Sequence, residues 1–150
     1  MIAENVKGII IGNAKGWVNQ IVKGFDGAGY VVQIFLFNAA RMGVPQKRER
    51  VFFIAHRKDL KYPKLSMEFH SKPIPFKDVR EPYGKTMDPD SMQAKLLKYR
   101  IPTDRCIADI NERVRKVKNN GFSTPINRDE EPVQTIVSGS SLYRMCDGLL

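Results

Sequence analysis

Two apolar runs of β-branched and aromatic residues, Tyr30–Phe37 and Val51–Ala55, most constrain the fold of this chain. Side chains of these types favour strands, and the scarcity of polar residues within the runs predicts strands that are buried on both faces. The segment between them, Asn38–Arg50, has the length of a loop. This arrangement suits two antiparallel strands at the edge of an otherwise parallel α/β sheet.

A helix is expected before the first run. Asn13 follows a short apolar stretch, and its side chain suits a helix cap because it can accept a hydrogen bond from a free amide of the first turn. Apolar residues then recur at helical spacing and would form one stripe. The stripe consists of Trp17, Val18, Ile21, Val22 and Phe25. Gly27–Gly29 would end the helix, since glycine is common at helix C-termini.

The character of the sequence changes near residue 59. From Asp59 onward proline recurs and the charges alternate in sign, which predicts a domain boundary at this point. Asp88 as the cap and Pro89 as the first helical residue would begin a helix that runs to about residue 100. Thr103 would cap a second helix that ends near residue 120, and Pro132–Val137 would form a strand.

The charge of the chain favours a polyanionic partner. Its 150 residues carry a formal net charge of +9, and 42% of them are hydrophobic, which is enough for a core. Residues 1–58 hold nine Lys and Arg against three acids, so the positive charge is concentrated there. A basic surface attracts nucleic acid through counterion release, although the same charge can serve solubility alone.

The two cysteines, Cys106 and Cys146, have no neighbouring Cys or His at the spacing of metal ligands. We therefore expect neither a metal site nor a disulfide framework, and a reducing cytoplasm is the expected location. No signal-peptide pattern opens the chain, and no apolar run approaches the ~18 residues that a membrane span needs. A cytoplasmic protein without membrane segments is the expectation.

Two polar motifs carry most of the chemical information. The first is Glu4-Asn5-Val6, and the second places Gln46, Arg48 and Arg50 at alternate positions just before the apolar run at residue 51. In an extended segment these three side chains would project to one side, where guanidinium groups could bind phosphate. A solvated basic run and a surface glutamate are the structural alternatives. The apolar run favours the first interpretation, because it would anchor the basic segment to a core.

The order and interval of these motifs, with Asn38–Pro45 leading into the second, resemble the cytosine-5 DNA methyltransferases. The resemblance implies that Glu4 is the acid that serves ring nitrogen 3 of cytosine, and that Asn5 orders the loop around it. It also implies that Gln46, Arg48 and Arg50 contact the cytosine and the DNA phosphates. The implied parent reaction transfers a methyl group from S-adenosylmethionine to a cytosine that is flipped out of double-stranded DNA.

The same resemblance implies a fold of two parts. Residues 1–58 would form part of the Rossmann-like, S-adenosylmethionine-dependent methyltransferase sheet, and residues 59–150 would form part of a small α+β target-recognition domain. Thr135-Ile136 looks like a dipeptide that recurs near the end of that domain. Thr135, Ser138 and Ser140 are accordingly expected to contact DNA. A threonine within a strand is the structural alternative for Thr135.

Two motifs of the family are not found in the sequence. The nucleophile of the family lies in a Pro-Cys motif before the Glu-Asn-Val tripeptide, whereas only Met1–Ala3 precede Glu4 and neither cysteine follows a proline. Phe25–Gly29 imitates the glycine loop that holds S-adenosylmethionine. That loop should follow a strand and open a helix, but here it closes a helix and opens a strand. No cofactor-binding residue is therefore assigned.

The isolated chain is expected to be catalytically inactive for this reason. It would be a fragment, one subunit of a split enzyme, or the product of a degenerate gene, with the missing methyltransferase half or a second copy of itself as a partner. A non-catalytic basic DNA-binding module is an alternative function. A third is an interaction domain with no nucleic-acid role, which would leave the Gln46–Arg50 motif unexplained.

Overall fold

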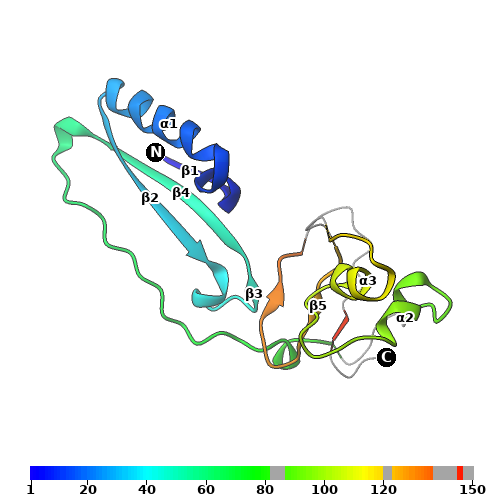
Figure 1. The fold of residues 1–150 in the computed structure, drawn as a ribbon. Helices are drawn as coiled ribbons and strands as arrows, with labels where there is room; N and C mark the ends of the chain where they lie inside the picture. The colour runs from blue at the N-terminus through cyan, green and yellow to red at the C-terminus, as the bar shows by residue number, and fades with distance from the viewer. Residues whose placement is uncertain (82–86, 120–122, 137–144, 147–150) are drawn as a thin grey trace. The chain divides into compact units, whose positions relative to one another are not determined.

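The computed structural model describes residues 1–81, 87–119, 123–136 and 145–146. The chain divides into two compact units, Met1–Lys72 and Pro73–Leu150. The first unit combines a three-stranded sheet with one α-helix, and the second combines short strands with two short helices (Figure 1). The α/β class predicted for the first part and the α+β class predicted for the second are both found.

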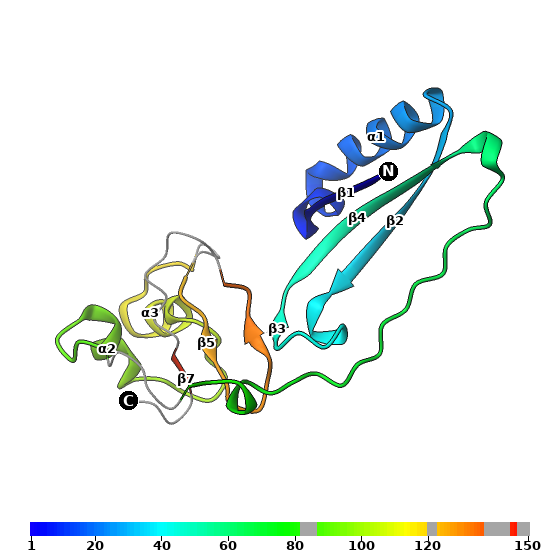
Figure 2. The ribbon, with the colours of Figure 1, turned by 180° about the vertical axis from the view of Figure 1, so that it is seen from behind.

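The sheet of the first unit has the strand order β1-β4-β2. Its strands are β1 (Ile2–Val6), β2 (Tyr30–Asn38) and β4 (Glu49–Arg57). The central strand β4 runs antiparallel to both neighbours, which confirms the predicted antiparallel pair of β2 and β4. Strands β1 and β2 therefore run in the same direction, and helix α1 (Lys15–Gly27) connects them (Figures 1 and 2).

Different segments of the chain pack on the two faces of this sheet. In β4, Val51, Phe53 and Ala55 are buried, and they project to the face on which α1 packs, here called the helix-covered face. The alternate residues of β4, including Arg50 and Phe52, project to the opposite face. Residues 61–72, which form neither helix nor strand, contact that opposite face. We call these residues the strap, and the face they contact the strap face.

The first compact unit extends to Lys72, whereas the sequence indicated a boundary near residue 59. Regular structure in the first unit ends with the 3-10 turn Lys58–Leu60, close to the expected boundary at residue 59. The strap nevertheless belongs to the first compact unit, because its side chains and backbone pack on the sheet. Other 3-10 turns of this unit are Lys7–Ile10, Gly12–Ala14 and Ala39–Arg41.

Helix α1 ends as predicted but begins differently. Gly29 follows it with a φ of +83°, a conformation that glycine adopts without strain. Asn13 does not cap the helix: it lies inside the 3-10 turn, and the cap residue Ala14 has no side-chain hydrogen bond. The chain is already helical at Ala14, so there is no extended cap position for Asn13 to fill. The predicted stripe is only half-buried, and Trp17 is 65% exposed.

Burial of β2 on both faces is also not observed. Val31 is 36% exposed, Ile34 37% and Leu36 43%. One helix covers one face and the strap covers part of the other, so neither layer is wide enough to bury a nine-residue strand. The apolar run therefore predicted the strand correctly but overestimated how much of it is buried.

The second unit is built around a small core beneath α2 (Met92–Leu97) and α3 (Ile107–Arg115). The core residues are Leu96, Leu97, Ile107, Ile110 and Ile126. Among the described residues of this unit, three two-residue strands accompany the helices: β5 (Ile126–Asn127), β6 (Val133–Gln134) and β7 (Met145–Cys146). Of these, β5 and β7 pair in parallel. A 3-10 turn at Phe76–Asp78 contributes Phe76, which packs on Val133 in a second, smaller cluster.

Helix α2 begins later than the sequence predicted. Asp88 does not cap it, because its carboxylate accepts a hydrogen bond from the Asp90 amide at 2.9 Å and forms a turn. Ser91 is the cap, and its hydroxyl accepts from the Ala94 amide at 3.2 Å. Residues 88–91 contain more than one side chain that can cap a helix, and the predicted cap, Asp88, was wrong.

Thr103 does not cap helix α3; a side chain of the first turn of the helix accepts the hydrogen bonds at its N-terminus. Its cap residue is Cys106, and the Asp109 carboxylate in the first turn accepts hydrogen bonds from the amides of Arg105 at 2.8 Å and Cys106 at 3.1 Å. The predicted helix end near residue 120 lies outside the described residues, and α3 itself ends at Arg115. Of the strand predicted at residues 132–137, the described part up to residue 136 contains only β6, so Thr135 lies outside the observed strand, and residue 137 lies outside the described residues.

Candidate functional site

The two sequence motifs meet on the strap face. Nε of Arg50 in β4 lies 2.7 Å from Oε1 of Glu4 in β1. The strand register explains this contact: Val6 is opposite Arg50 and Phe52 is opposite Glu4, so the two charged side chains are diagonal neighbours on one face. The Arg50 side chain is 20% exposed and that of Glu4 is 48% exposed. The pair is therefore open to solvent from the Glu4 side.

A second hydrogen bond orients the Arg50 guanidinium. Its Nη1 atom donates to the backbone carbonyl of Glu49 at 2.8 Å. The planar guanidinium is thus held at two of its three nitrogens, which fixes the direction in which its remaining donors point. Arg50 is therefore held by both a carboxylate and a backbone carbonyl.

The Glu-Asn-Val tripeptide lies within β1 rather than at the end of a strand. Glu4 projects to the strap face, so Asn5 projects to the helix-covered face by the alternation of the strand. The Asn5 side chain accepts a hydrogen bond from the Val6 amide at 2.8 Å. Asn5 therefore contacts the backbone of β1 next to Glu4.

The segment that carries Gln46 and Arg48 is a compact loop. The Ala39 amide donates to the carbonyl of Arg48 at 3.0 Å, which closes the loop across its base. At its start the Asn38 side chain accepts from the Ala40 amide at 3.0 Å, and Ala40 itself is buried. Gly43 at the far end has a φ of +79°. These bonds give the two motif residues a defined backbone position.

A continuous extended run from Gln46 to Arg50 is not observed. Strand β3 (Gln46–Lys47) is separated from β4 at Arg48, where the Arg48 amide donates to the carbonyl of Gln46 at 3.0 Å and closes a tight turn. The strict alternation on which the sequence argument relied is therefore broken. Within the part of the chain that the structure describes, the Arg48 guanidinium has no hydrogen bond or ion pair, in contrast to Arg50.

The neighbours of the Glu4–Arg50 pair were not predicted from the sequence. Phe37 is opposite Arg50 in the register of β2 and β4, and Phe52 is opposite Glu4 in the register of β1 and β4. Just beyond β1, Nζ of Lys7 lies 2.8 Å from Oε2 of Glu49. The aromatic residues at odd positions of β2 were visible in the sequence, but only the register shows that Phe37 lies opposite Arg50.

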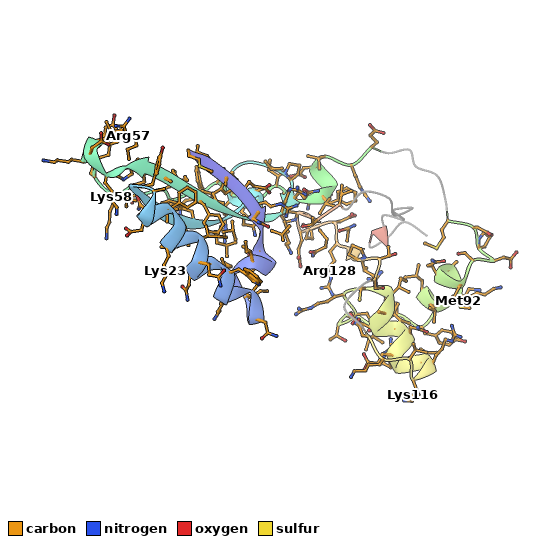
Figure 3. The ribbon with its side chains drawn as sticks, turned by 90° about the horizontal axis from the view of Figure 1, so that it is seen from above. Lys23, Arg57, Lys58, Met92, Lys116 and Arg128 are labelled. Carbon is orange, nitrogen blue, oxygen red and sulfur yellow. The ribbon has the colours of Figure 1, made fainter. Side chains whose placement is uncertain are left out.

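The candidate residues of the second unit are only partly described. Thr135 is half-buried and follows directly after β6, which excludes the strand position weighed for it. Ser138 and Ser140 lie outside the described residues. Among the cations of this unit, Lys116 follows α3 and is exposed, whereas Arg128 donates to the carbonyl of Pro102 (Figure 3).

The segment that imitates the S-adenosylmethionine loop of the family does not have the geometry of that loop. Phe25–Gly29, the segment that imitates the glycine loop of the family, ends α1 and enters β2, so no helix N-terminus follows it. An open depression of about 440 Å³ borders Ala28, Gly29 and Tyr30 at this end of the sheet. Its charged lining residues are paired: Arg57 with Asp59 of the same lining at 2.5 Å, and Lys58 with Asp26 outside it at 2.7 Å. Arg57 and Lys58 are labelled in Figure 3.

Two other classes of site were considered for the described residues. No group of three or more His, Cys, Asp or Glu side chains in residues 1–81, 87–119, 123–136 and 145–146 could hold a metal ion. Over the same residues, no helix has both the length and the apolar character needed to cross a membrane.

Comparison with known proteins places the sequence in a family. The sequence profile of the C-5 cytosine-specific DNA methylase family matches residues 1–144. The type II methyltransferase M.NgoPII of Neisseria gonorrhoeae is 40% identical over 98 residues, which cover 63% of this chain and 29% of that protein. The type II methyltransferase M.FnuDI of Fusobacterium nucleatum is 38% identical over 114 residues, which cover 74% of this chain and 32% of that protein.

The matched region is therefore about a third of the length of these relatives. Among solved structures, the Dnmt2 methyltransferase of S. pombe aligns with 96% of this chain and 41% of its own, at 11% identity and a TM-score of 0.46. The family profile spans almost the whole sequence, including both motifs that meet at the Glu4–Arg50 pair. This chain belongs to the C-5 cytosine-specific DNA methylase family.

Proposed function

We propose that this chain supplies the cytosine-contacting and target-recognition part of a DNA (cytosine-5-)-methyltransferase. The observation that carries the proposal is the 2.7 Å contact between Glu4 and Arg50, two residues that the sequence places in separate motifs. A site for a flipped cytosine needs an acid for ring nitrogen 3 and a donor for the adjacent carbonyl oxygen. Glu4 and Arg50 provide one of each on the same sheet face.

Glu4 acts in this proposal by meeting charge that develops in the ring. When a nucleophile adds to carbon 6, electron density moves toward ring nitrogen 3. Glu4 would stabilise it there in its protonated form, which requires the carboxylate to take up a proton and to exchange its contact with Arg50 for one with the base. Arg50 is permanently charged and held by the Glu49 carbonyl, so it can bind the carbonyl oxygen without reorganising. Asn5 holds the β1 backbone beside Glu4.

Arg48 and Gln46 would contact the DNA backbone next to the extruded base. The loop that carries them is fixed at its base by the Ala39–Arg48 hydrogen bond, and the Arg48 guanidinium is not engaged by another described side chain. Thr135, Ser138 and Ser140 would contribute DNA contacts from the second unit. Double-stranded DNA is the proposed substrate.

The nucleophile and the methyl donor site must then come from another polypeptide segment. Within the described residues β1 pairs only with β4, so its second edge is open, and Ile2 is 69% exposed and Val6 54% exposed beside it. Trp17 on α1 is also 65% exposed. Open strand edges with apolar neighbours favour strand pairing. We propose that this edge binds the methyltransferase half that carries the nucleophile, or a second copy of this chain in its absence, in the cytoplasm.

Methyl transfer to duplex DNA from tritiated S-adenosylmethionine tests the proposal. The purified chain is assayed alone and after co-expression with the upstream part of M.NgoPII, a relative that shares 40% identity with this chain. We expect no transfer from the chain alone and transfer from the pair. Transfer by the chain alone would contradict the proposal, as would a stable complex of the two polypeptides that transfers nothing.

A non-catalytic DNA-binding module is the second candidate, and the net charge of +9 favours it. In that case Glu4 would have no role beyond its ion pair with Arg50. The same assay separates the two functions: a binding module would bind DNA in the complex but would not support transfer.

A further inference from the structure

The strap is attached to the sheet at points that lead to the Glu4–Arg50 pair. At its middle the Gln33 side chain makes a reciprocal clamp with Leu65: its Nε2 donates to the Leu65 carbonyl at 3.1 Å, and its Oε1 accepts from the Leu65 amide at 2.8 Å. Near its end the Ser71 amide donates to the carbonyl of Arg41, in the loop that carries Gln46 and Arg48, at 3.0 Å. The strap therefore holds the sheet and the motif loop together.

Between these two attachments, Phe69 packs on the aromatic residues of the strap face. Its ring meets that of Phe37 edge to face, with the centroids 5.1 Å apart and the planes at 87°. Phe37 in turn lies 5.5 Å from Phe35 in a stacked arrangement and 5.5 Å from Phe52. Edge-to-face and offset contacts of this kind stabilise aromatic clusters beyond the apolar area that they bury.

This aromatic cluster is adjacent to both charged residues. Phe37 is opposite Arg50, and Phe52 is opposite Glu4, on the same face of the sheet. The aliphatic part of an arginine side chain packs on such neighbours, which limits the rotamers that its guanidinium can adopt. Movement of Phe37 or Phe52 would consequently be transmitted to the ion pair.

We propose that Phe69 is a positioning residue for the Glu4–Arg50 pair. The strap presses Phe69 against Phe37, and Phe37 keeps the Arg50 guanidinium directed toward Glu4. This inference rests on the proposed function for the purpose of the pair, but the positioning itself is a property of the isolated chain. The Gln33–Leu65 clamp supports the strap in this role.

The Nε–H signal of Arg50 in a ¹H–¹⁵N spectrum reports the positioning directly, and the loss of that signal in Arg50→Lys assigns it. In Phe69→Ala we expect hydrogen exchange of this Nε–H to accelerate by at least about fivefold, because the guanidinium leaves Glu4 more often. Phe69→Leu should restore part of the protection. Exchange of the Val51 amide in β4 shows whether the sheet remains folded.

Tyr62→Ala is the matched control. Tyr62 is also a strap aromatic residue, but it contacts His56 at the other end of β4, with ring centroids 5.9 Å apart. We expect it to leave the Arg50 Nε–H unchanged. Equal effects of Phe69→Ala and Tyr62→Ala, or no effect of Phe69→Ala in a folded sheet, would overturn the inference. Loss of Arg50 protection without any loss of methyl transfer in the complemented enzyme would instead contradict the proposed function.

Discussion

Nε of Arg50 and Oε1 of Glu4 lie 2.7 Å apart because β1 and β4 pair in a single register. A shift of that register by one residue would turn Glu4 to the helix-covered face and separate the pair. Val51, Phe53 and Ala55 are buried on that face, so the shift would also place a carboxylate among them. Burial of the apolar residues of β4 therefore keeps the charged pair on the strap face.

Stability of the second unit should depend on Arg113. Its Nη2 atom donates to the carboxylate of buried Asp104 and to the carbonyl of Tyr99, each at 2.7 Å. We expect Arg113→Ala to lower the free energy of unfolding by about 1–3 kcal/mol, because the buried carboxylate loses its charged partner. Urea denaturation followed by far-UV circular dichroism measures this.

Arg115→Ala provides the control for that measurement. Arg115 is exposed on the same helix and donates only to the sulfur of Met92, at 3.5 Å, among the bonds described for it. Its replacement should change the free energy of unfolding by less than about 0.5 kcal/mol. Similar losses in the two variants would show that the Asp104 contact does not stabilise the unit.

Helix α3 should lose stability in acid through Asp109. The hydrogen bond from the Arg105 amide, with smaller contributions from Cys106 and Asn119, holds the pKa of the Asp109 carboxyl below its ordinary value of 3.8. Since the folded pKa lies below the unfolded one, the stabilisation is complete above about pH 4 and is lost as the pH falls through the folded pKa.

Asp109→Asn tests this pH dependence. The amide cannot ionise, so the variant should be less stable than the parent at pH 7, by about 0.5–1 kcal/mol, and should show a smaller decline below pH 4. Unfolding free energies from pH 2 to 7 measure both effects. Parallel profiles of the two proteins would contradict the assignment to Asp109.

The parts of the fold that the sequence predicted are those that are determined locally. The apolar residues of β2 and β4 favour strands wherever they lie, and Gly27–Gly29 ends α1 because few other residues adopt the conformation of Gly29. The proximity of Glu4 and Arg50 depends on register, which pairs residues distant in sequence. Resemblance to a family indicated that both belong to one site, but not their geometry.

The mispredicted features are those for which several residues could play the same role, those with too few residues to show a pattern, and those that depend on how much of an element is buried by its neighbours. Asp88 and Ser91 can both cap a helix; in the structure Ser91 caps α2, and Asp88 forms a turn with Asp90. Strands β5 and β6 have two residues each, too few for alternation to be recognised. The exposure of Trp17 depends on the width of the sheet beneath α1, which no pattern in the helix records.

Binding of duplex DNA by the isolated chain should be weak, independent of sequence and steeply dependent on salt. Each phosphate contact contributes about −0.9 to the slope of log K against log salt, so Arg48→Ala should make the slope shallower by about 0.9. Lys23→Ala is the control, because Lys23 is exposed and projects from α1 away from the sheet (Figure 3). Fluorescence anisotropy at several salt concentrations distinguishes them, and equal slopes in all three proteins would rule out a phosphate contact at Arg48.

Trp17 should report association at the open edge of the first unit. It is the single tryptophan of the chain and is 65% exposed. Its emission should therefore shift to shorter wavelength when the proposed methyltransferase partner binds and covers α1. Sedimentation of the chain alone should show self-association that the added half suppresses. A monomer at high micromolar concentration, with unchanged emission in the complex, would mean that this edge is not the interface.

The single-turnover rate of methyl transfer by Glu4→Gln, in the enzyme completed by the upstream half, tests the central claim most directly. Glutamine keeps the shape of the side chain but cannot serve as an acid, so the rate should fall by about 10²–10⁴ while DNA affinity stays within about threefold. Lys7→Gln, which removes the neighbouring ion pair with Glu49, should retain nearly the full rate. A wild-type rate in Glu4→Gln, or an equal loss in Lys7→Gln, would contradict the assignment of Glu4 as the acid of the cytosine site.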